Sequence, residues 1–212
     1  MLVRAARGER SAGHAPGKVP ALVFTALAAA LFCACGQGNK DMVNAPMDKN
    51  AKLETATMAG GCFWGVEEIL RAVPGVEDPV AGYTGGTTEN PKYEEVKTGT
   101  TGHAESIQFR FDPAKVSYGA LLDLFFRMHD PTTPDRQGND IGTQYRSAIF
   151  YHDEAQKQEA EAAVKRAQAS GLWKRPITTK ISPAGKFWPA EDYHQDYLKK
   201  HPGGYTCHYI RD

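Results

Sequence analysis

The pattern of apolar and polar residues predicts four β-strands in this chain. The clearest lies at 105–113, where Ile107, Phe109 and Phe111 face one side and polar residues separate them. A period of two is what a strand with one buried face requires. Runs bounded by glycine, proline or polar turns predict three further strands, at 54–61, 147–152 and 177–183.

Apolar residues spaced three and four positions apart predict helices after three of these strands. The first should end at Pro74 and Gly75. The last has early acids and late basic residues, as the helix dipole favours, with Asp153 as the expected N-cap and Gly171 as the expected stop. The expected helices cover 63–72, 116–130 and 154–170.

Long irregular loops separate these elements. Turn-forming residues dominate 82–103 and 131–146, and 187–212 begins as a short helix and continues as a glycine-containing tail. Strands and helices alternate loosely, and no glycine-rich phosphate loop follows a strand. We therefore expect a compact α+β fold, a two-layer sandwich with helices packed on a mixed or antiparallel sheet and a ferredoxin-like plait at its core.

The N-terminal segment has a different composition. Four basic residues precede 15 uncharged residues at 21–35, and the sequence then turns polar. This order is typical of a secretory leader, and the apolar run is short for a membrane span, which takes about 20 residues. The residues before Cys35 resemble the box preceding the acylated cysteine of bacterial lipoproteins, although Phe32 stands where Leu is usual.

We therefore expect a leader at 1–35, a flexible tether at 36–53 and a catalytic domain at 54–212. The protein would be exported to the periplasm or cell envelope, with its only membrane contact a lipid anchor at Cys35. Secretion without acylation and an uncleaved anchor are the alternatives.

Charge outside the leader argues against nucleic acid as a partner. Residues 36–212 hold 21 basic and 24 acidic residues. No basic stripe is left to neutralise phosphates. The histidines and cysteines form no zinc-binding pattern, so we expect no metal and no cofactor.

Two cysteines remain outside the leader, Cys62 and Cys207. In an exported protein they would by default form one structural disulfide. Cys62, however, falls where a predicted strand meets a predicted helix, and a helix N-terminus lowers the pKa of a thiol and favours the thiolate. Position alone leaves two interpretations open: a reactive thiol, or a small buried residue beside the aromatic residues Phe63 and Trp64.

Glu105 is the second unusual residue. Period-two alternation puts its side chain on the apolar face of the predicted strand 105–113. A buried carboxyl without a cationic partner has a raised pKa, which suits a general acid near neutral pH. The alternative is an acid on an edge strand that reaches water. The predicted loops bring Asp140, Gln144 and Tyr145 close together and also contain Tyr83. The phenolic hydroxyls of these tyrosines could donate hydrogen bonds to an oxygen of a ligand. The alternative is that they are ordinary surface or core residues.

Five motifs in this chain together resemble a known family. They are "GGCFWGVE", "GYTGG", "GHAESI", "DIGTQYRSAI" and "FWPAEDYHQDYL", in this order. They resemble the motifs of the A-type peptide methionine sulfoxide reductases (MsrA), and the resemblance extends over about 54–212. It implies an enzyme, which we expect to be monomeric.

The resemblance implies a reaction for these residues. Cys62 attacks the sulfur of methionine sulfoxide, Glu105 protonates the departing oxygen, and a sulfenic acid remains on Cys62. Cys207 condenses with it to a disulfide, the ordinary fate of a sulfenic acid. Thioredoxin or a thioredoxin-like domain then reduces the disulfide. The glycine-loosened tail would bring Cys207 to Cys62 only after the first step.

The resemblance also implies how the substrate is held. The S epimer at sulfur would be preferred, in free methionine sulfoxide or in oxidised proteins. Aromatic side chains would contact the methyl group, and hydroxyl groups and a carboxylate, the latter through water, would hold the oxygen. The implied residues are Phe63 and Trp64 for the methyl group, and Tyr83, Tyr145 and Asp140 for the oxygen.

Two other functions fit parts of the sequence. A cysteine hydrolase or acyltransferase would use Cys62 with His103 or His194 as base, and would not need Cys207. An exported binding module would use a disulfide between Cys62 and Cys207 as a structural staple. The activity of a Cys207→Ser variant and the stability of the reduced protein distinguish both from a reductase.

Overall fold

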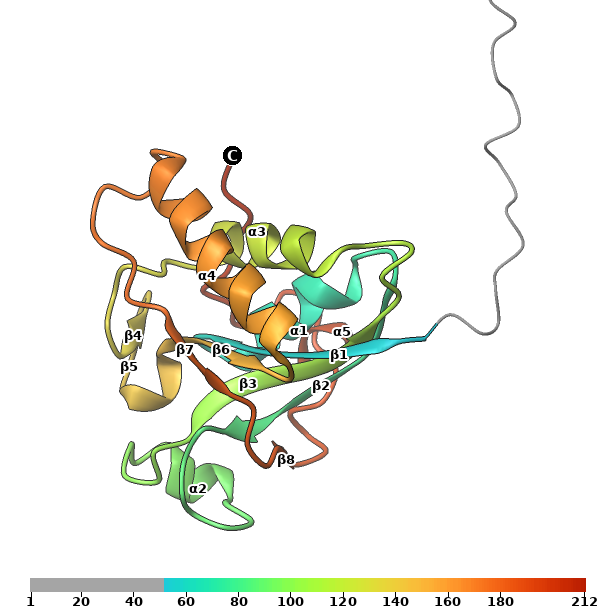
Figure 1. Ribbon diagram of the computed structural model, residues 1–212. Coiled ribbons are helices and arrows are strands. Elements are labelled where there is room, and N and C mark those ends of the chain that lie inside the picture. The colour runs from blue at the N-terminus through green and yellow to red at the C-terminus, as the bar shows by residue number, and fades with distance from the viewer. Residues whose placement is uncertain (1–51) are drawn as a thin grey trace, which may run out of the picture. The chain divides into compact units, whose positions relative to one another are not determined.

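The computed structural model describes residues 52–212, drawn in colour in Figure 1. The expected leader, Cys35 and most of the expected tether lie outside the described residues. Each helix in 52–212 is too short or too polar to span a lipid bilayer.

A six-stranded sheet forms one layer of the fold. Its strand order is β7-β6-β1-β3-β2-β8, and neighbouring strands are antiparallel except β6 and β7, which are parallel. The expected α+β architecture with a mixed sheet is therefore confirmed. The strands are β1 (Glu54–Gly60), β2 (Val76–Thr84), β3 (Ala104–Phe111), β6 (Ser147–Tyr151), β7 (Lys180–Pro183) and β8 (Trp188–Pro189).

The inner four strands have the order of a ferredoxin-like plait, β6-β1-β3-β2. Helix α1 (Phe63–Arg71) connects β1 to β2, and α3 (Tyr118–Met128) lies between β3 and β6. Because β1 and β3 pair antiparallel, the end of β1 lies beside the start of β3 at the centre of the sheet. The topology thus brings two segments that are distant in sequence to one point.

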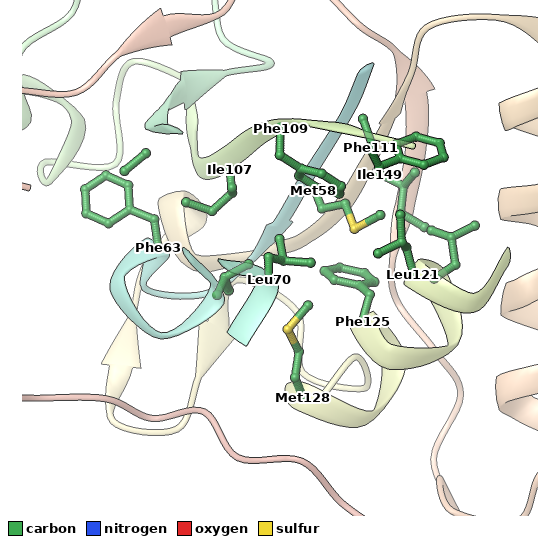
Figure 2. Close-up of a cluster of buried hydrophobic side chains, with 14 of the residues drawn as sticks. Met58, Phe63, Leu70, Ile107, Phe109, Phe111, Leu121, Phe125, Met128 and Ile149 are labelled. Atoms are coloured by element: carbon green, nitrogen blue, oxygen red, sulfur yellow. The ribbon is translucent and has the colours of Figure 1, made fainter. Parts of the chain in front are cut away.

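Helices α1, α3 and α4 (Glu154–Ala169) cover one face of the sheet (Figure 1). Figure 2 shows the core between these layers, where Leu70 of α1 and Phe125 of α3 meet Met58 of β1 and Ile107 of β3. These side chains are fully buried. Burial of each contributes about 1.5–3 kcal/mol. The core therefore fixes α1 on the sheet.

Side-chain caps begin α3 and α4, and at α4 both ends follow the expected signals. Asp153 accepts a hydrogen bond from the Gln156 amide at 2.8 Å, as an N-cap does, and Ser117 accepts one from the Ala120 amide at 3.1 Å. Gly171, with a φ of +80°, lies just beyond the C-terminal end of α4. Local capping chemistry accordingly fixes where α3 and α4 begin.

Several elements differ from the sequence prediction. Strand β2 is missed because Asp78, with a φ of +48°, and Pro79 interrupt its pattern, and its register with β3 shifts between Glu77 and Val80. The expected loops contain short elements whose pattern is too brief to recognise. These are α2 (Tyr93–Val96), β4 (Arg136–Gln137), β5 (Asp140–Ile141) and a 3-10 turn (Thr143–Tyr145). The segment 187–212 does not begin as the expected short helix, because strand β8 lies there and the helix of this segment, α5 (Tyr197–Lys200), comes later.

Candidate active site

Cys62 lies directly after β1, in the N-cap position of α1, and is 6% exposed. The predicted strand-to-helix junction is confirmed. Gly61 has a φ of +103°, a conformation that a residue without a Cβ adopts most readily, so it can turn the chain from strand into helix. Because β1 and β3 pair antiparallel, the end of β1, which leads into Cys62, lies beside the start of β3, which carries Glu105.

Glu105 lies at the start of β3 with its side chain on the helix-facing side, as alternation predicts. It is 2% exposed, and one carboxyl oxygen accepts a hydrogen bond from the Phe63 amide at 3.2 Å. Burial raises the pKa of this carboxyl to about 8; the Phe63 amide opposes the shift and the charge of Asp140 adds to it. Glu105 is therefore mostly protonated at neutral pH.

Cys62 and Glu105 line the same small pocket, about 90 Å³ in volume. The other lining residues come from the start of α1, α2, β5, the 3-10 turn and the C-terminal segment. Six predicted site residues are brought together here: Cys62, Phe63, Trp64, Glu105, Asp140 and Tyr145. Two lining residues were not predicted, Tyr93 and Tyr205.

Tyr83 does not line the pocket, contrary to expectation. It pairs across the sheet with Glu105, but its side chain is fully buried and its hydroxyl donates a hydrogen bond to Glu191 at 3.0 Å. Tyr93, the first residue of α2, lines the pocket instead. Its sequence context, "NPKYEE", carries a signal, because Pro91 followed by acids is typical of a helix start.

The phenols of Tyr93 and Tyr145 keep their protons. Burial raises the pKa of both, and the charge of Glu105 raises it further. Together with protonated Glu105, they give the pocket several O–H donors, and among the described residues no cationic side chain lines it. The pocket therefore suits a ligand with one acceptor oxygen and an apolar group.

The thiol of Cys62 is not activated in the way that the sequence predicts. Burial raises its pKa and the charge of Glu105 raises it further, whereas the Trp64 amide at the start of α1 lowers it. The expected effect of the helix N-terminus is thus present, but desolvation outweighs it. Cys62 is a thiol in the free protein, so its ionisation has to accompany the reaction.

The C-terminal tail is docked beside the pocket and is not loose. Sγ of Cys207 lies 3.4 Å from Oδ2 of Asp140, which also accepts a hydrogen bond from the Tyr205 hydroxyl at 3.1 Å. His208 is buried, with its Nε2 2.7 Å from the carbonyl oxygen of Gly60. Cys207 is a free thiol. The expected loose tail is therefore wrong, because the segment that carries Cys207 is packed beside the pocket.

Two glycines next to Cys62 make room for neighbouring chain. A Cβ on Gly65 would lie 2.4 Å from Oγ1 of Thr206 and 2.5 Å from Nδ1 of His208. A Cβ on Gly61 would lie 2.5 Å from the Gln137 side chain. Gly65 therefore allows the tail to pack directly on α1.

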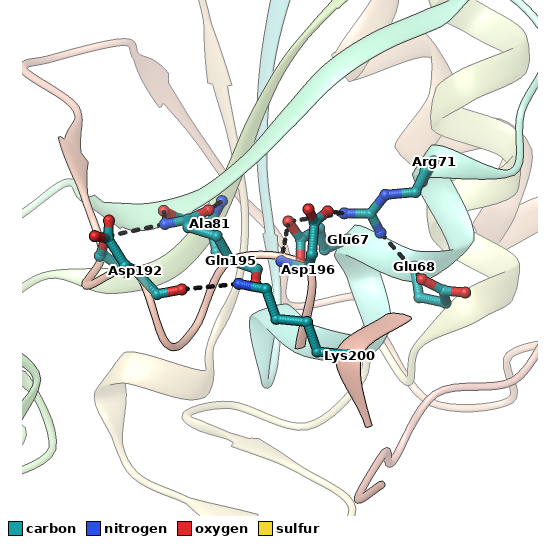
Figure 3. Close-up of polar contacts among 9 residues, drawn as sticks. Glu67, Glu68, Arg71, Ala81, Asp192, Gln195, Asp196 and Lys200 are labelled. Carbon is teal, nitrogen blue, oxygen red and sulfur yellow. Dashed lines mark hydrogen bonds and ion pairs between the residues drawn. The ribbon is translucent and has the colours of Figure 1, made fainter. Parts of the chain in front are cut away.

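Residues 194–197, just before the C-terminal tail, support Trp64, one of the aromatic residues that line the pocket. Trp64 stacks on Tyr197, with 3.7 Å between ring centroids, and its Nε1 donates a hydrogen bond to Nδ1 of His194 at 3.1 Å. Figure 3 shows polar contacts that hold this segment on α1 and β2. Among them are those of Arg71 with Asp196 and of Gln195 with the backbone of Ala81.

Neither histidine proposed as the base of a cysteine hydrolase or acyltransferase is placed to act on Cys62. His103 accepts a hydrogen bond from the Gly86 amide and contacts the Thr88 carbonyl, while His194 is bonded to Trp64. Within 52–212, neither histidine hydrogen-bonds to Cys62, so the thiol and base pair of such an enzyme is not formed. In the same residues, no group of three or more His, Cys, Asp or Glu side chains could hold a metal ion.

Comparison with known proteins gives one consistent result. The family model for peptide methionine sulfoxide reductase matches residues 54–212. A peptide methionine sulfoxide reductase MsrA from Methanoculleus marisnigri is 58% identical over 158 residues, which cover 74% of this chain and 96% of the relative. One from Nocardia farcinica is 53% identical over 156 residues, which cover 74% and 89%.

Solved structures give the same picture. Mxr1 from Saccharomyces cerevisiae in reduced form has a TM-score of 0.72 and 39% identity, over 77% of this chain and 94% of Mxr1. Methionine sulfoxide reductase A of Corynebacterium diphtheriae has a TM-score of 0.65 and 41% identity, over 73% and 77%. Mxr1 in complex with Trx2 matches with a TM-score of 0.53 and 30% identity, over 77% and 93%.

Proposed function

Because the chain belongs to the peptide methionine sulfoxide reductase family, we propose that it reduces methionine sulfoxide to methionine and thereby repairs oxidised proteins. The substrate is the S epimer, free or within a protein, and the enzyme acts as a monomer. Thioredoxin or a thioredoxin-like domain supplies the electrons. In support, the similar protein Mxr1 has been solved in complex with Trx2.

One observation carries this proposal: a free thiol and a protonated carboxyl line one aromatic pocket. The oxygen of a sulfoxide is a poor leaving group, so a nucleophile alone would stall. Glu105, with its pKa of about 8, supplies the proton that the oxygen needs. The hydroxyls of Tyr93 and Tyr145 donate hydrogen bonds to the same oxygen.

The rest of the pocket orients the substrate. Phe63 and Trp64 present an apolar wall to the methyl group of the sulfoxide. Asp140 helps to position the oxygen through water. A sulfoxide carries three different substituents around its sulfur, so an apolar wall on one side and donors on another select one epimer.

The first step transfers oxygen from the substrate to Cys62. As Sγ attacks the sulfoxide sulfur, Glu105 gives its proton to the oxygen. This attack bonds the two sulfurs. The hydroxyl then moves from the substrate sulfur to Sγ, so a bond between oxygen and Sγ forms, the bonds of the substrate sulfur to oxygen and to Sγ both break, and methionine leaves. The thiol proton of Cys62 replaces the proton lost by Glu105, so the carboxyl ends in its acid form and Cys62 becomes a sulfenic acid.

The second step closes a disulfide. Sγ of Cys207 attacks the sulfenic acid on Cys62, the two sulfurs bond, and water leaves. The position of Cys207 beside Asp140 at the pocket supports this role. Residues 36–212 contain no third cysteine, so the disulfide itself is presented to the reductant, whose dithiol returns both cysteines to thiols.

The test is an assay of methionine formation from the S epimer with dithiothreitol as reductant. We expect Cys62→Ser to abolish activity and Glu105→Gln to lower kcat by about 10²–10⁴-fold, the range for a lost general acid. Glu161→Gln, an exposed acid on α4, is the matched control and should match the wild type. Full activity of Cys62→Ser would overturn the proposal.

We propose in addition that the protein is exported and anchored by a lipid at Cys35. Support comes from the basic start, the uncharged run at 21–35 and the residues before Cys35. Mass spectrometry of the mature protein should find an acylated Cys35 as the first residue, in the membrane fraction. An intact N-terminus on protein in the soluble cytoplasmic fraction would contradict export.

A further inference from the structure

His208 places one ring nitrogen beside the sulfur of Cys207. Its Nδ1 lies 3.6 Å from Sγ, within hydrogen-bonding range for sulfur, and its Nε2 lies 2.7 Å from the carbonyl oxygen of Gly60. The residue is 7% exposed and its ring packs over Gly65. The ring is therefore held by the end of β1 on one side and by α1 on another.

The Gly60 carbonyl fixes the tautomer of this ring. A carbonyl oxygen can only accept a hydrogen bond, so Nε2 has to carry the proton. Nδ1 of the neutral ring then keeps a lone pair directed at its partner. Within 52–212, the one hydrogen-bonding partner of Nδ1 is the thiol of Cys207. A nucleophile, a base and a group that orients the base form the arrangement of an activated nucleophile.

Asp140 is the other acceptor near the thiol, because its Oδ2 lies 3.4 Å from Sγ of Cys207. That oxygen already accepts a hydrogen bond from the Tyr205 hydroxyl. A carboxylate is also an intrinsically weaker base than an imidazole. Asp140 is better suited to stabilise a positive charge on His208 than to take the proton itself.

We propose that His208 is the general base of the second step, and that its Nδ1 takes the proton of Cys207 as Sγ attacks the sulfenic acid on Cys62. The inference rests on the proposed function, which supplies that sulfenic acid. The S–S bond forms, the S–O bond breaks, and hydroxide leaves with its electron pair. The proton held by His208 passes to the hydroxide, so one water leaves and the ring is neutral again.

The surrounding charges are consistent with this role. Burial lowers the pKa of His208, the Gly60 carbonyl and Asp140 oppose the shift, and Arg211 adds to it, so the ring is neutral at neutral pH. The nearby His129 also stays neutral, because burial lowers its pKa to about 3. Burial raises the pKa of Cys207 to about 12. The thiol therefore needs a neighbouring base to attack at neutral pH.

The experiment follows disulfide formation without any reductant. Reduced protein is mixed with one equivalent of hydrogen peroxide, which makes the sulfenic acid on Cys62 without the sulfoxide reaction. Free thiols are then blocked at intervals and counted by mass spectrometry. His208→Gln keeps an N–H donor for Gly60 but carries no group that can take up a proton at neutral pH. We expect it to close the disulfide about 10²-fold more slowly at neutral pH, with the sulfenic acid accumulating and trapped by dimedone.

The pH profile separates a lost base from a displaced tail. In His208→Gln the rate should rise about tenfold per pH unit between pH 7 and 9, because only the thiolate of Cys207 attacks. The wild-type rate should change little over this range. His201→Gln, the same substitution at an exposed position before the tail, is the control and should match the wild type.

Two results would overturn the role of His208: a His208→Gln variant that closes the disulfide at the wild-type rate, or a deficit that stays constant between pH 7 and 9. The proposed function is tested separately, by methionine formed from the sulfoxide by wild-type protein. If wild type forms no methionine but the peroxide experiment gives the expected difference, the proposed function fails and the assignment of His208 stands.

Discussion

The two thiols of the domain lie in regions of very different construction. Cys62 follows a central strand and begins a helix, with a continuous hydrophobic core beneath it. Cys207 lies on an irregular tail held mainly by side-chain contacts, such as those of His208 with Gly60 and of Cys207 with Asp140. Regions of the second kind can open locally without global unfolding. The attacking thiol thus has a fixed position, and the resolving thiol has one that it can leave.

This contrast suits the two tasks. Cys62 has to keep its position relative to Glu105, because proton transfer requires hydrogen-bonding distances. Cys207 has to meet Cys62 and afterwards an external protein, so its segment must both dock and be released. Variants that act on one region alone test whether this division is real.

The largest effect should come from Cys207→Ser. A serine cannot form the disulfide, so turnover supported by thioredoxin should fall to background. The first step should still yield one methionine per protein molecule, because the region of Cys62 is intact. Methionine is measured by chromatography with and without the thioredoxin system. Sustained thioredoxin-dependent turnover would break the comparison, since the reductant would then act on Cys62 directly.

A smaller effect is expected from Gly65→Ala. This substitution changes α1, the helix on which the tail packs, and so disturbs the docking of the tail. The new Cβ would lie within 2.5 Å of both Thr206 and His208. Displacing the tail by about 1 Å should slow disulfide closure by about 10²-fold. Alanine favours the helix by up to about 1 kcal/mol relative to glycine, so the free energy of unfolding should not fall.

The control for this variant is Gly185→Ala, where the new Cβ has nothing within 4 Å. Disulfide closure is followed by blocking free thiols, and stability by urea denaturation. A slower closure accompanied by a clear loss of stability would mean that the scaffold, and not the tail, is damaged.

The region of Cys62 should also make the stability of the protein depend on pH, because it contains Glu105. Its pKa is about 8 in the folded protein and ordinarily 4.5. Between these values the folded protein binds more protons than the unfolded chain, so the free energy of unfolding falls as the pH rises. Glu105→Gln lacks this contribution, and its Tm relative to wild type should rise from pH 5 to 8 in calorimetry. Glu161→Gln should show no such trend.

The smallest effect is expected at a site that belongs to neither thiol. Asp153 caps α4, and Asp153→Ala should lower the free energy of unfolding by about 1 kcal/mol. Methionine formation and disulfide closure should both match the wild type. A change in either rate would show that the thiol regions depend on the packing of α4 as well.

The sequence predicts the first of these regions better than the second. Regular alternation reveals the buried side of Glu105, and a strand running into a helix reveals the position of Cys62. Both are local patterns repeated over many residues. The docking of Cys207 depends on contacts with Asp140 and with the end of β1, far away in sequence, and no local pattern encodes them.

Two errors have the same origin. Tyr83 was expected in the pocket, but its orientation is decided by Glu191, more than a hundred residues away, while Tyr93 enters from a four-residue helix. The pKa of Cys62 was expected to fall at the helix N-terminus. The effect of the nearby amide is predictable from sequence, but the larger desolvation depends on how completely the tertiary structure covers the sulfur.

The C-terminal tail has a second role, because Tyr205, two residues before Cys207, also lines the substrate pocket. A truncation before residue 205 would therefore delete part of the binding surface together with the thiol. Loss of activity in such a shortened protein would say nothing about recycling alone. Affinity tags and fusion partners are for the same reason better attached at the opposite end of the domain.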